Sequence, residues 1–316
     1  MIGVKARFSR VDDWLCRLRW RFDAREAARV CAVTAVDPLH LALFGSEDEQ
    51  HGSVLKERLA AWSSLDIPRF PAPGAEMASL RPFAIWVYPM AIAQFIRSLP
   101  GKIFGFAGPP GSGKSTLVAL LIPCLQALDC QIRVAGVSLD DFYLSREERA
   151  RRGLRWRAQP GTHDIRSAVD LMQGVQEERG SLRIPRFDPR QDSPGTASQI
   201  QGALSLLLFE GWIVGMRDGG YEKLSEMVDF LIYLDYPLPL AKRRRLQRER
   251  ELRSSSGQRG GFSAPEMLRF WHEVLEPGIE KWVLPIKEHA DLVISLGATG
   301  GVVHAKLIDR GCHCFS

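Results

Sequence analysis

A glycine-rich segment at residues 108–115 carries the clearest chemical signal in the chain. It reads GPPGSGKS and fits the pattern G-x-x-x-x-G-K-[S/T] at every position. Glycine lacks a Cβ atom, so the N–H groups of such a turn can point inward at phosphate oxygens. Lys114 would reach the β and γ phosphates of a nucleoside triphosphate, and Ser115 would offer its hydroxyl to Mg²⁺. The predicted nucleotide-binding residues are Gly108, Pro109, Pro110, Gly111, Ser112, Gly113, Lys114, Ser115 and Thr116.

Carboxylates follow two of the apolar runs in the sequence. Asp140 and Asp141 lie in SLDDFYL, and Glu210 lies in LLLFEGW. A carboxylate that ends a buried strand is poorly solvated and needs a cation, so Glu210 is predicted to lie near Mg²⁺ unless it caps a turn. Asp140 is predicted to be the general base that takes the proton of an attacking alcohol. Asp141 could cap the next segment instead, and the sequence favours Asp140 without separating the two neighbours.

Arginines are concentrated in residues 237–253, PLPLAKRRRLQRERELR. Helical spacing puts Arg244 and Arg248 on one face, where they could cover the charge that develops during phosphoryl transfer. The Gly- and Ser-rich residues 254–266 that follow would suit a hinge. We therefore predict a lid over about 238–262, although a solvated helix paired with its own glutamates would account for half of these arginines.

Five near-continuous apolar runs recur with helix-like sequence between them. Such runs are typical of a parallel sheet covered on both faces. The predicted fold class is α/β, a P-loop NTPase-type doubly wound parallel sheet with helices on both faces. Residues 1–78 are predicted to be an N-terminal helical extension, with the Pro- and Gly-rich residues 64–77 as a linker, and residues 79–316 to be the catalytic domain. The runs are 102–108, 131–139, 203–211, 229–237 and 290–297.

Composition narrows the class of protein. The chain has 316 residues and a net charge of +5 that comes largely from local arginine clusters, which favours small anionic ligands over a nucleic-acid track. Trp156, in RGLRWRAQP, is the one candidate for base stacking. The six cysteines are scattered, so no disulfide framework is expected, and Cys312–Cys314 is read as a terminus rather than a metal site. No apolar run is long enough to span a bilayer, so a cytoplasmic protein without a membrane partner is expected.

Five motifs in their order along the chain resemble one known family. GPPGSGKST, SLDDFYL, QPGTHDI, IPRFD and LLLFEGW are similar to the D-glycerate 3-kinases, the P-loop glycerate kinases of plants, fungi and cyanobacteria. These are related to phosphoribulokinase, uridine kinase and bacterial pantothenate kinase. The resemblance covers about residues 80–300 and implies ATP and Mg²⁺ as cofactors. It also implies that Asp140 is the catalytic base and that Glu210 lies near Mg²⁺.

The same resemblance indicates which residues face the acceptor. The PGTHD and PRFD segments match acceptor-side loops. Arg157 and Arg186 lie beside these loops and are predicted to bind a carboxylate, because a guanidinium can donate two parallel hydrogen bonds to it. They could also be ordinary surface arginines. The predicted catalytic residues are Asp140, Lys114, Arg244 and Arg248, and the predicted metal ligands are Ser115 and Glu210. The predicted substrate contacts are Asp141, Tyr143, Arg157, His163, Asp164, Arg186 and Asp188.

One segment departs from the family pattern. Glycerate kinases of this type usually continue from the Phe-Asp pair as Lys-Ser and reach a Gly-Asp-Arg, whereas this chain reads FDPRQDSPGTASQ with Pro189 in the lysine position. The chain would then use another cation, such as Arg190, or another acceptor. The favoured function is γ-phosphoryl transfer from Mg-ATP to the 3-hydroxyl of D-glycerate. The alternatives are a kinase for another small hydroxylated metabolite (a nucleoside, pantothenate or a sugar acid) and a nucleotide-dependent regulatory or chaperone protein. The oligomeric state stays open.

Overall fold

The computed structural model describes residues 37–44, 53–55, 57–58, 60–61, 88–189, 191–255, 262–298 and 300–308. The predicted linker, the Cys312–Cys314 segment, Arg190 and residues 256–261 of the predicted hinge lie outside these ranges. Within them, no helix combines the length and apolarity that crossing a bilayer requires.

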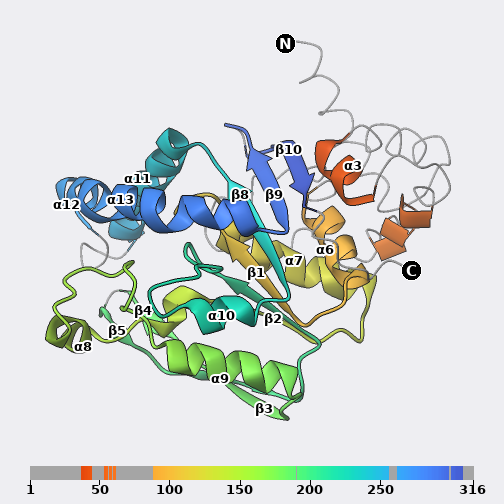
Figure 1. Cartoon of the computed structure of the whole chain (residues 1–316), viewed down its shortest axis with the longest axis horizontal. Coiled ribbons are helices and arrows are strands. Elements are labelled where there is room, and N and C mark those ends of the chain that lie inside the picture. The colour runs from red at the N-terminus through yellow and green to blue at the C-terminus, as the bar shows by residue number, and fades with distance from the viewer. Residues whose placement is uncertain are drawn as a thin grey trace.

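A six-stranded sheet forms the centre of the molecule (Figure 1). Its strand order is β10-β9-β8-β1-β7-β2, and all neighbours run parallel except β10, which is antiparallel to β9. Each of the five predicted runs forms one parallel strand, so the predicted fold class is confirmed. β10 was not predicted, because an edge strand with exposed positions lacks a continuous apolar run. The strands are β1 (Ile103–Ala107), β2 (Val134–Ser138), β7 (Leu206–Glu210), β8 (Phe230–Asp235), β9 (Leu292–Leu296) and β10 (Val302–Leu307).

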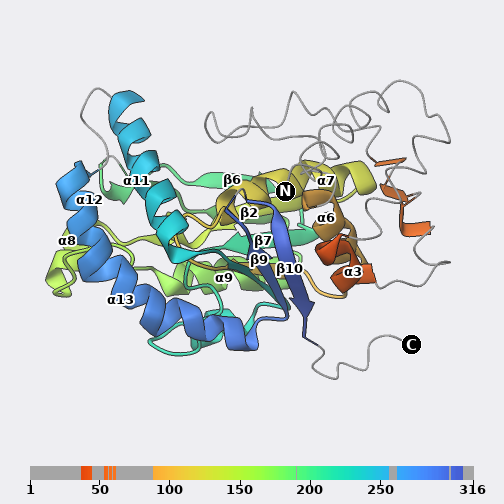
Figure 2. The same cartoon turned by 90° about the horizontal axis from the view of Figure 1, so that it is seen from above.

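Helices cover both faces of the sheet. The chain moves outward from β1 to β2 and then returns through β7 to β8 and β9. Right-handed crossovers therefore place α7 (Lys114–Leu128) on one face and α9 (Ile165–Gln176) on the other. Helix α6 (Pro89–Ser98) packs beside α7. In Figure 2, α7 and α13 (Glu276–Gly278) lie on opposite sides of the strands.

Close packing holds α7 against the outer strand β2. A Cβ atom added to Gly136 would lie 2.7 Å from Val118 Cγ1 and 3.3 Å from Ile122 Cδ1. Glycine at this point therefore lets the helix lie close to the strand. Because α7 begins at Lys114, this contact also fixes where the lysine enters the site.

Two further groups of elements flank the sheet. The first comprises α8 (Arg146–Arg151), the ribbon of β3 (Ser181–Ile184) with β6 (Ser198–Gln201), and the hairpin of β4 (Phe187–Asp188) with β5 (Ser193–Pro194). The second comprises α10 (Glu222–Glu226), α11 (Leu238–Ser255), α12 (Ala264–Phe270) and α13. Two π-helical turns, Trp271–Leu275 and Ile279–Val283, and a 3₁₀ turn, Leu284–His289, complete the second group.

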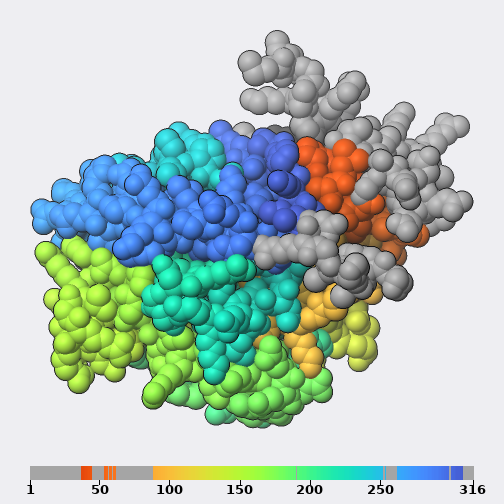
Figure 3. Space-filling view, viewed as in Figure 1, coloured from red at the N-terminus to blue at the C-terminus, as the bar shows by residue number. Residues whose placement is uncertain are grey.

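An aromatic contact joins these two groups. The ring of Trp156, from the loop after α8, lies 5.9 Å from Phe262 and 5.4 Å from Phe270 between centroids. Figure 3 shows the blue residues of α12 and α13 resting on the yellow-green residues around α8. Trp156, the candidate for base stacking, is therefore partly buried in an internal contact.

The described part of the predicted N-terminal extension packs on the sheet domain. Helix α3 (Pro38–Phe44) contacts β10 and α6. The fully buried Arg58 donates from Nε to Gln94 Oε1 at 3.1 Å and lies 3.2 Å from His40 Nδ1 through Nη2.

Candidate active site

The glycine-rich loop connects β1 to α7 and packs on backbone atoms of two other elements. A Cβ atom on Gly108 (φ 137°) would lie 2.4 Å from the carbonyl oxygen of Leu234, and one on Gly111 (φ 87°) would lie 2.7 Å from that of Ala241. Only glycine accommodates both the positive φ and this close approach. The predicted nucleotide-binding residues 108–116 thus form a compact loop against β8 and α11, with the positive end of the α7 dipole at its mouth.

Lys114 lies inside the loop. Its side chain is 7% exposed, and its ammonium group donates to the carbonyl oxygens of Gly108 at 2.7 Å and Pro109 at 2.9 Å. Burial lowers the pKa of Lys114 to about 8, while the nearby carboxylates of Glu210 and Asp140 act in the opposite direction. The lysine is therefore placed between the phosphate loop and the two carboxylates that the sequence singled out.

Ser115 and Glu210 form a pair at the ends of α7 and β7. The Ser115 hydroxyl donates to Glu210 Oε1 at 2.8 Å, and the Glu210 side chain also bonds to Ser138. Burial raises the pKa of Glu210, and Lys114 offsets part of this rise. A buried carboxylate beside a hydroxyl offers the hard oxygen ligands that Mg²⁺ prefers, and a divalent cation would relieve the cost of the buried charge. These residues fit a magnesium site completed by phosphate oxygens and water.

Asp140 stands at the exposed side of this cluster, directly after β2. Its backbone N–H donates to Ser138 Oγ at 3.3 Å, and its carboxylate accepts a hydrogen bond from the Tyr143 hydroxyl. Burial, and then the charge of Asp140, raise the pKa of Tyr143, which stays protonated. Asp140 is therefore oriented by a neutral donor.

Asp141 is held by the residues at the start of β4. Its carboxylate accepts from Arg186 Nη1 at 2.8 Å and from the backbone N–H of Phe187 at 3.3 Å. Burial raises the pKa of Asp141, and Arg186 lowers it. These contacts anchor β4, and Arg186, 44% exposed, shares the ion pair; the substrate contact of Asp141 stays a prediction. The two neighbouring aspartates are thus distinguished by their partners.

Arg157 lies over the aromatic surface beside Asp140. Its guanidinium carbon is 5.3 Å from the Phe187 ring centroid and 6.0 Å from that of Tyr143. Its Nε lies 3.5 Å from Asp192 Oδ1, and Asp192 Oδ2 forms an ion pair with Arg149 Nη2 at 2.6 Å. Asp192 therefore joins the β4–β5 hairpin to the α8 segment and helps to place Arg157. Sequence reasoning missed both Arg149, which is 1% exposed, and Asp192.

The QPGTHDI segment places His163 under Tyr143. The two rings stack with centroids 4.3 Å apart, and His163 Nδ1 lies 2.6 Å from the Tyr221 hydroxyl. Burial, and then the charge of Arg149, lower the pKa of His163 to about 3, so the ring is neutral at physiological pH.

Asp164, a predicted substrate contact, caps α9. Its Oδ1 accepts from the backbone N–H of Ser167 at 3.2 Å and its Oδ2 from the Ser167 hydroxyl at 2.6 Å. Both oxygens cap α9, so the carboxylate positions the loop. Asp188 lies in β4, and its Oδ1 accepts from the N–H of Gln191 at 3.4 Å.

The α11 arginines divide differently from the prediction. Arg245, which was not selected, pairs with the buried Glu249 at 2.6 Å and interacts electrostatically with Asp140. The charge of Arg248 acts on Lys114. Arg244 instead stacks over Tyr236, 4.4 Å from its ring centroid. Arg245 and Arg248 therefore face the site, while Arg244 lies on another part of the helix surface. The i, i+3 spacing of Arg245 and Arg248 was the signal that could have revealed this.

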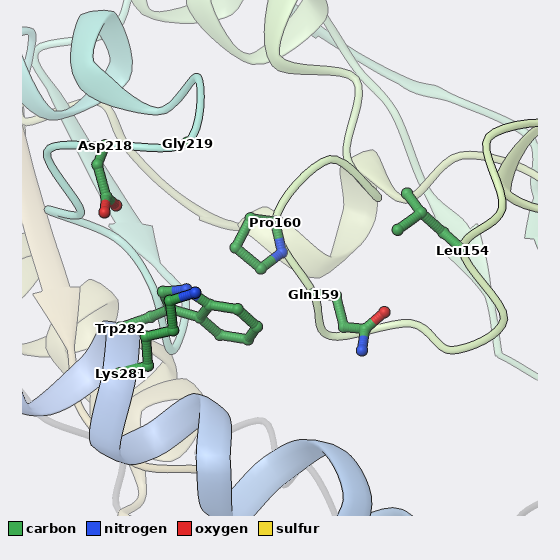
Figure 4. Close-up of a pocket in the computed structure, with 7 residues that line it drawn as sticks. All are labelled: Leu154, Gln159, Pro160, Asp218, Gly219, Lys281 and Trp282. Carbon is green, nitrogen blue, oxygen red and sulfur yellow. The ribbon is translucent and has the colours of Figure 1, made fainter.

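A cavity of about 380 Å³ opens beside the acceptor-side loops (Figure 4). Gln159 and Pro160, the first residues of the QPGTHDI segment, line one side, and Asp218, shortly before Tyr221, lines another. In Figure 4 the Trp282 ring faces Pro160 across the opening. The cavity thus borders both segments that carry the His163–Tyr221 contact.

A phosphate loop with its lysine, a Ser–Glu pair and a strand-end aspartate at one edge of a parallel sheet define a P-loop nucleotide-binding protein. Residues 103–302 match the model of the Phosphoribulokinase / Uridine kinase family, and the chain belongs to that family.

Individual relatives agree with this assignment. The chain is 30% identical to "D-glycerate 3-kinase, chloroplastic" of Arabidopsis thaliana over 38% of this chain and 30% of that one. It is 27% identical to a pantothenate kinase of Leifsonia xyli over 61% of this chain and 65% of that one. The solved structure of the YGR205w protein is 18% identical and covers 72% of this chain and 98% of its own, with a TM-score of 0.57. The resemblance inferred from the motifs is therefore confirmed.

The matched segment spans less than a third of the Arabidopsis relative and slightly less than two thirds of the Leifsonia one. The family is established by the match of residues 103–302 to the family model.

Proposed function

We propose that this protein is an ATP-dependent kinase that transfers the γ-phosphoryl group of Mg-ATP to the 3-hydroxyl of D-glycerate, giving 3-phosphoglycerate and ADP. The observation that carries the proposal is the convergence of charges on Asp140. Its carboxylate interacts with Lys114 of the phosphate loop, with Glu210 at the end of β7 and with Arg245 of α11. A carboxylate placed among a phosphate-binding lysine, a metal-binding glutamate and an arginine suits a base for phosphoryl transfer.

In this mechanism the loop and Lys114 bind the phosphates and hold the γ-phosphorus in line with the acceptor hydroxyl. Asp140 accepts the hydroxyl proton as the oxygen forms its bond to phosphorus and the bond to the β-phosphate oxygen breaks. Tyr143 holds the Asp140 carboxylate in position. Arg245 and Arg248 stabilise the negative charge on the transferring group. Mg²⁺, held by Ser115 and Glu210, would neutralise phosphate charge.

A carboxylate-bearing acceptor fits the cationic groups on the acceptor side. Arg157 lies over Tyr143 and Phe187, next to the proposed base. A guanidinium suits a carboxylate because it offers two parallel donors. Asp188 and His163 are proposed to contact the acceptor hydroxyl groups. The name of the Arabidopsis relative supports glycerate as the acceptor.

Pantothenate is the second candidate. It also combines a hydroxyl with a carboxylate, and the Leifsonia pantothenate kinase aligns over more of this chain, 61% against 38% for the glycerate kinase. Pro189, between β4 and β5, stands where glycerate kinases usually have lysine, and this difference supports an acceptor other than glycerate.

The test is ADP release by the purified protein with Mg-ATP and, in turn, D-glycerate, L-glycerate, pantothenate, uridine or no acceptor. Lys114→Ala and Asp140→Asn are measured beside the wild type, and Arg243→Ala, an exposed arginine of α11, serves as a control. A rate that requires D-glycerate and is lost in the first two variants supports the proposal. A rate that requires pantothenate supports the second candidate. ADP release at the same rate with and without every acceptor contradicts both candidate functions.

A further inference from the structure

Tyr221 lies outside the site described so far and contacts one of its residues. It is the residue before α10, it is fully buried, and its hydroxyl lies 2.6 Å from His163 Nδ1. Fifty-eight positions separate the two residues in the sequence. No motif marks Tyr221, so its relation to the acceptor-side loop comes from the fold alone.

The hydrogen-bond partners of Tyr221 determine which nitrogen of His163 carries the proton. The backbone N–H of Gly161 interacts with the Tyr221 oxygen, which therefore acts as an acceptor there. Within the described ranges, the acceptor that lies within hydrogen-bond distance of the Tyr221 hydroxyl is His163 Nδ1, 2.6 Å away. A buried hydroxyl proton needs an acceptor. Tyr221 then donates to Nδ1, and the neutral imidazole must carry its own proton on Nε2.

In this arrangement the Nε2–H group of His163 is left to donate a hydrogen bond to a ligand. His163 is 3% exposed, and Nε2 is buried without a hydrogen-bond partner among the residues that the structure describes. A buried donor without a partner is costly, so such groups have a reason to be retained. The His163 ring also stacks under Tyr143, whose hydroxyl bonds to Asp140. The unpartnered donor thus lies one ring away from the residue that orients the proposed base.

We propose that Tyr221 is a positioning residue for the acceptor: its hydroxyl fixes His163 as the Nε2–H tautomer, which donates a hydrogen bond to an oxygen of the hydroxy-acid substrate. This proposal rests on the proposed function for the identity of the ligand. Its structural part, the tautomer, stands independently of which acceptor is used.

The kinetic test compares Tyr221→Phe with Tyr233→Phe. Both changes remove one hydroxyl from a fully buried tyrosine, and the Tyr233 hydroxyl has no hydrogen-bond partner within the described residues. Loss of one neutral hydrogen bond in the acceptor site should raise KM for the acceptor about tenfold in Tyr221→Phe. KM for ATP should stay the same, and Tyr233→Phe should leave both constants unchanged. Equal KM values for the acceptor in wild type and Tyr221→Phe would overturn the proposal.

The spectroscopic test needs no substrate. Long-range ¹H–¹⁵N spectra of protein labelled at histidine nitrogens separate a protonated from an unprotonated ring nitrogen. The His163 signals are assigned by their loss in His163→Gln. The expected wild-type spectrum shows the proton on Nε2 and Nδ1 as a hydrogen-bonded acceptor, and in Tyr221→Phe the Nδ1 signal should move to the position of an acceptor without a hydrogen bond. A proton on Nδ1 in the wild type, or no change in the variant, refutes the proposal.

His163→Gln provides a further check, because its amide nitrogen occupies the place of Nε2 but has no tautomer. Tyr221→Phe should raise KM for the acceptor less in this background than in the wild type. A full additional loss would mean that Tyr221 acts by another route, which also counts against the proposal. If no acceptor is phosphorylated by the wild type, the proposed function fails, and the spectra alone decide the role of Tyr221.

Discussion

Nucleotide affinity should depend on pH through Lys114. Burial places the pKa of its ammonium group at about 8 in the protein without nucleotide. Bound phosphates favour the charged form, so above pH 8 the lysine must take up a proton before ATP can bind. The ratio of total to protonated lysine is about 1.1 at pH 7 and about 11 at pH 9. The dissociation constant for ATP should therefore rise about tenfold between these two values.

Calorimetric titration with ATP at pH 7, 8 and 9 measures this change. Above pH 8 the binding heat should vary with the ionisation enthalpy of the buffer and correspond to uptake of nearly one proton per site. ATP has lost its last phosphate proton across this range, so the proton must go to the protein. Lys114→Met serves as the control and should bind weakly with little change from pH 7 to 9.

A dissociation constant that stays constant from pH 7 to 9, without proton uptake, would refute the reasoning. It would mean that the neighbouring carboxylates of Glu210 and Asp140 fully offset burial. A thermal melt at each pH establishes that the fold is intact.

Three further changes test the site and the packing. Glu210→Gln should lower kcat about 100-fold and raise the Mg²⁺ concentration needed for half activity, because the buried carboxylate is lost; an unchanged Mg²⁺ dependence would contradict its assignment as a ligand. Arg245→Met should lower kcat about 100-fold, whereas Arg243→Met should have little effect. Equal losses in both would show that the charge of α11 acts only collectively. Gly136→Ala should lower the free energy of unfolding in urea by about 1–3 kcal/mol, because the new methyl overlaps a side chain of α7. Gly180→Ala, where nothing lies within 4 Å of the added methyl, is the control, and equal stability of the two variants would contradict this account of the packing.

The phosphate loop could be predicted from the sequence because its chemistry is local. Its residues follow one another along the chain, and β1 and α7 leave it no other arrangement. The five parallel strands could also be predicted from the sequence, since strands buried on both faces are apolar throughout. β10 was missed for the same reason, because its exposed positions interrupt that pattern.

The different partners of Asp140 and Asp141 come from the tertiary structure. Both carboxylates follow the same strand, and what separates them is Arg186, 45 positions further along the chain. The partners of the α11 arginines could not be predicted either, because helical spacing gives relative directions only. Which direction points at Lys114 depends on how α11 packs, and that packing turns Arg245 to the site and Arg244 to Tyr236.

The sequence by itself determined the fold class, the family and the phosphate loop, because each is written in adjacent residues or in a repeated apolar pattern. The tertiary structure decided the partners of the acceptor-side residues: Asp141 with Arg186, Arg157 with Asp192, and His163 with Tyr221. These pairs connect distant segments, and their side chains follow no periodicity. Only the packing that brings the segments together fixes which side chains lie in the site and which hold it in place.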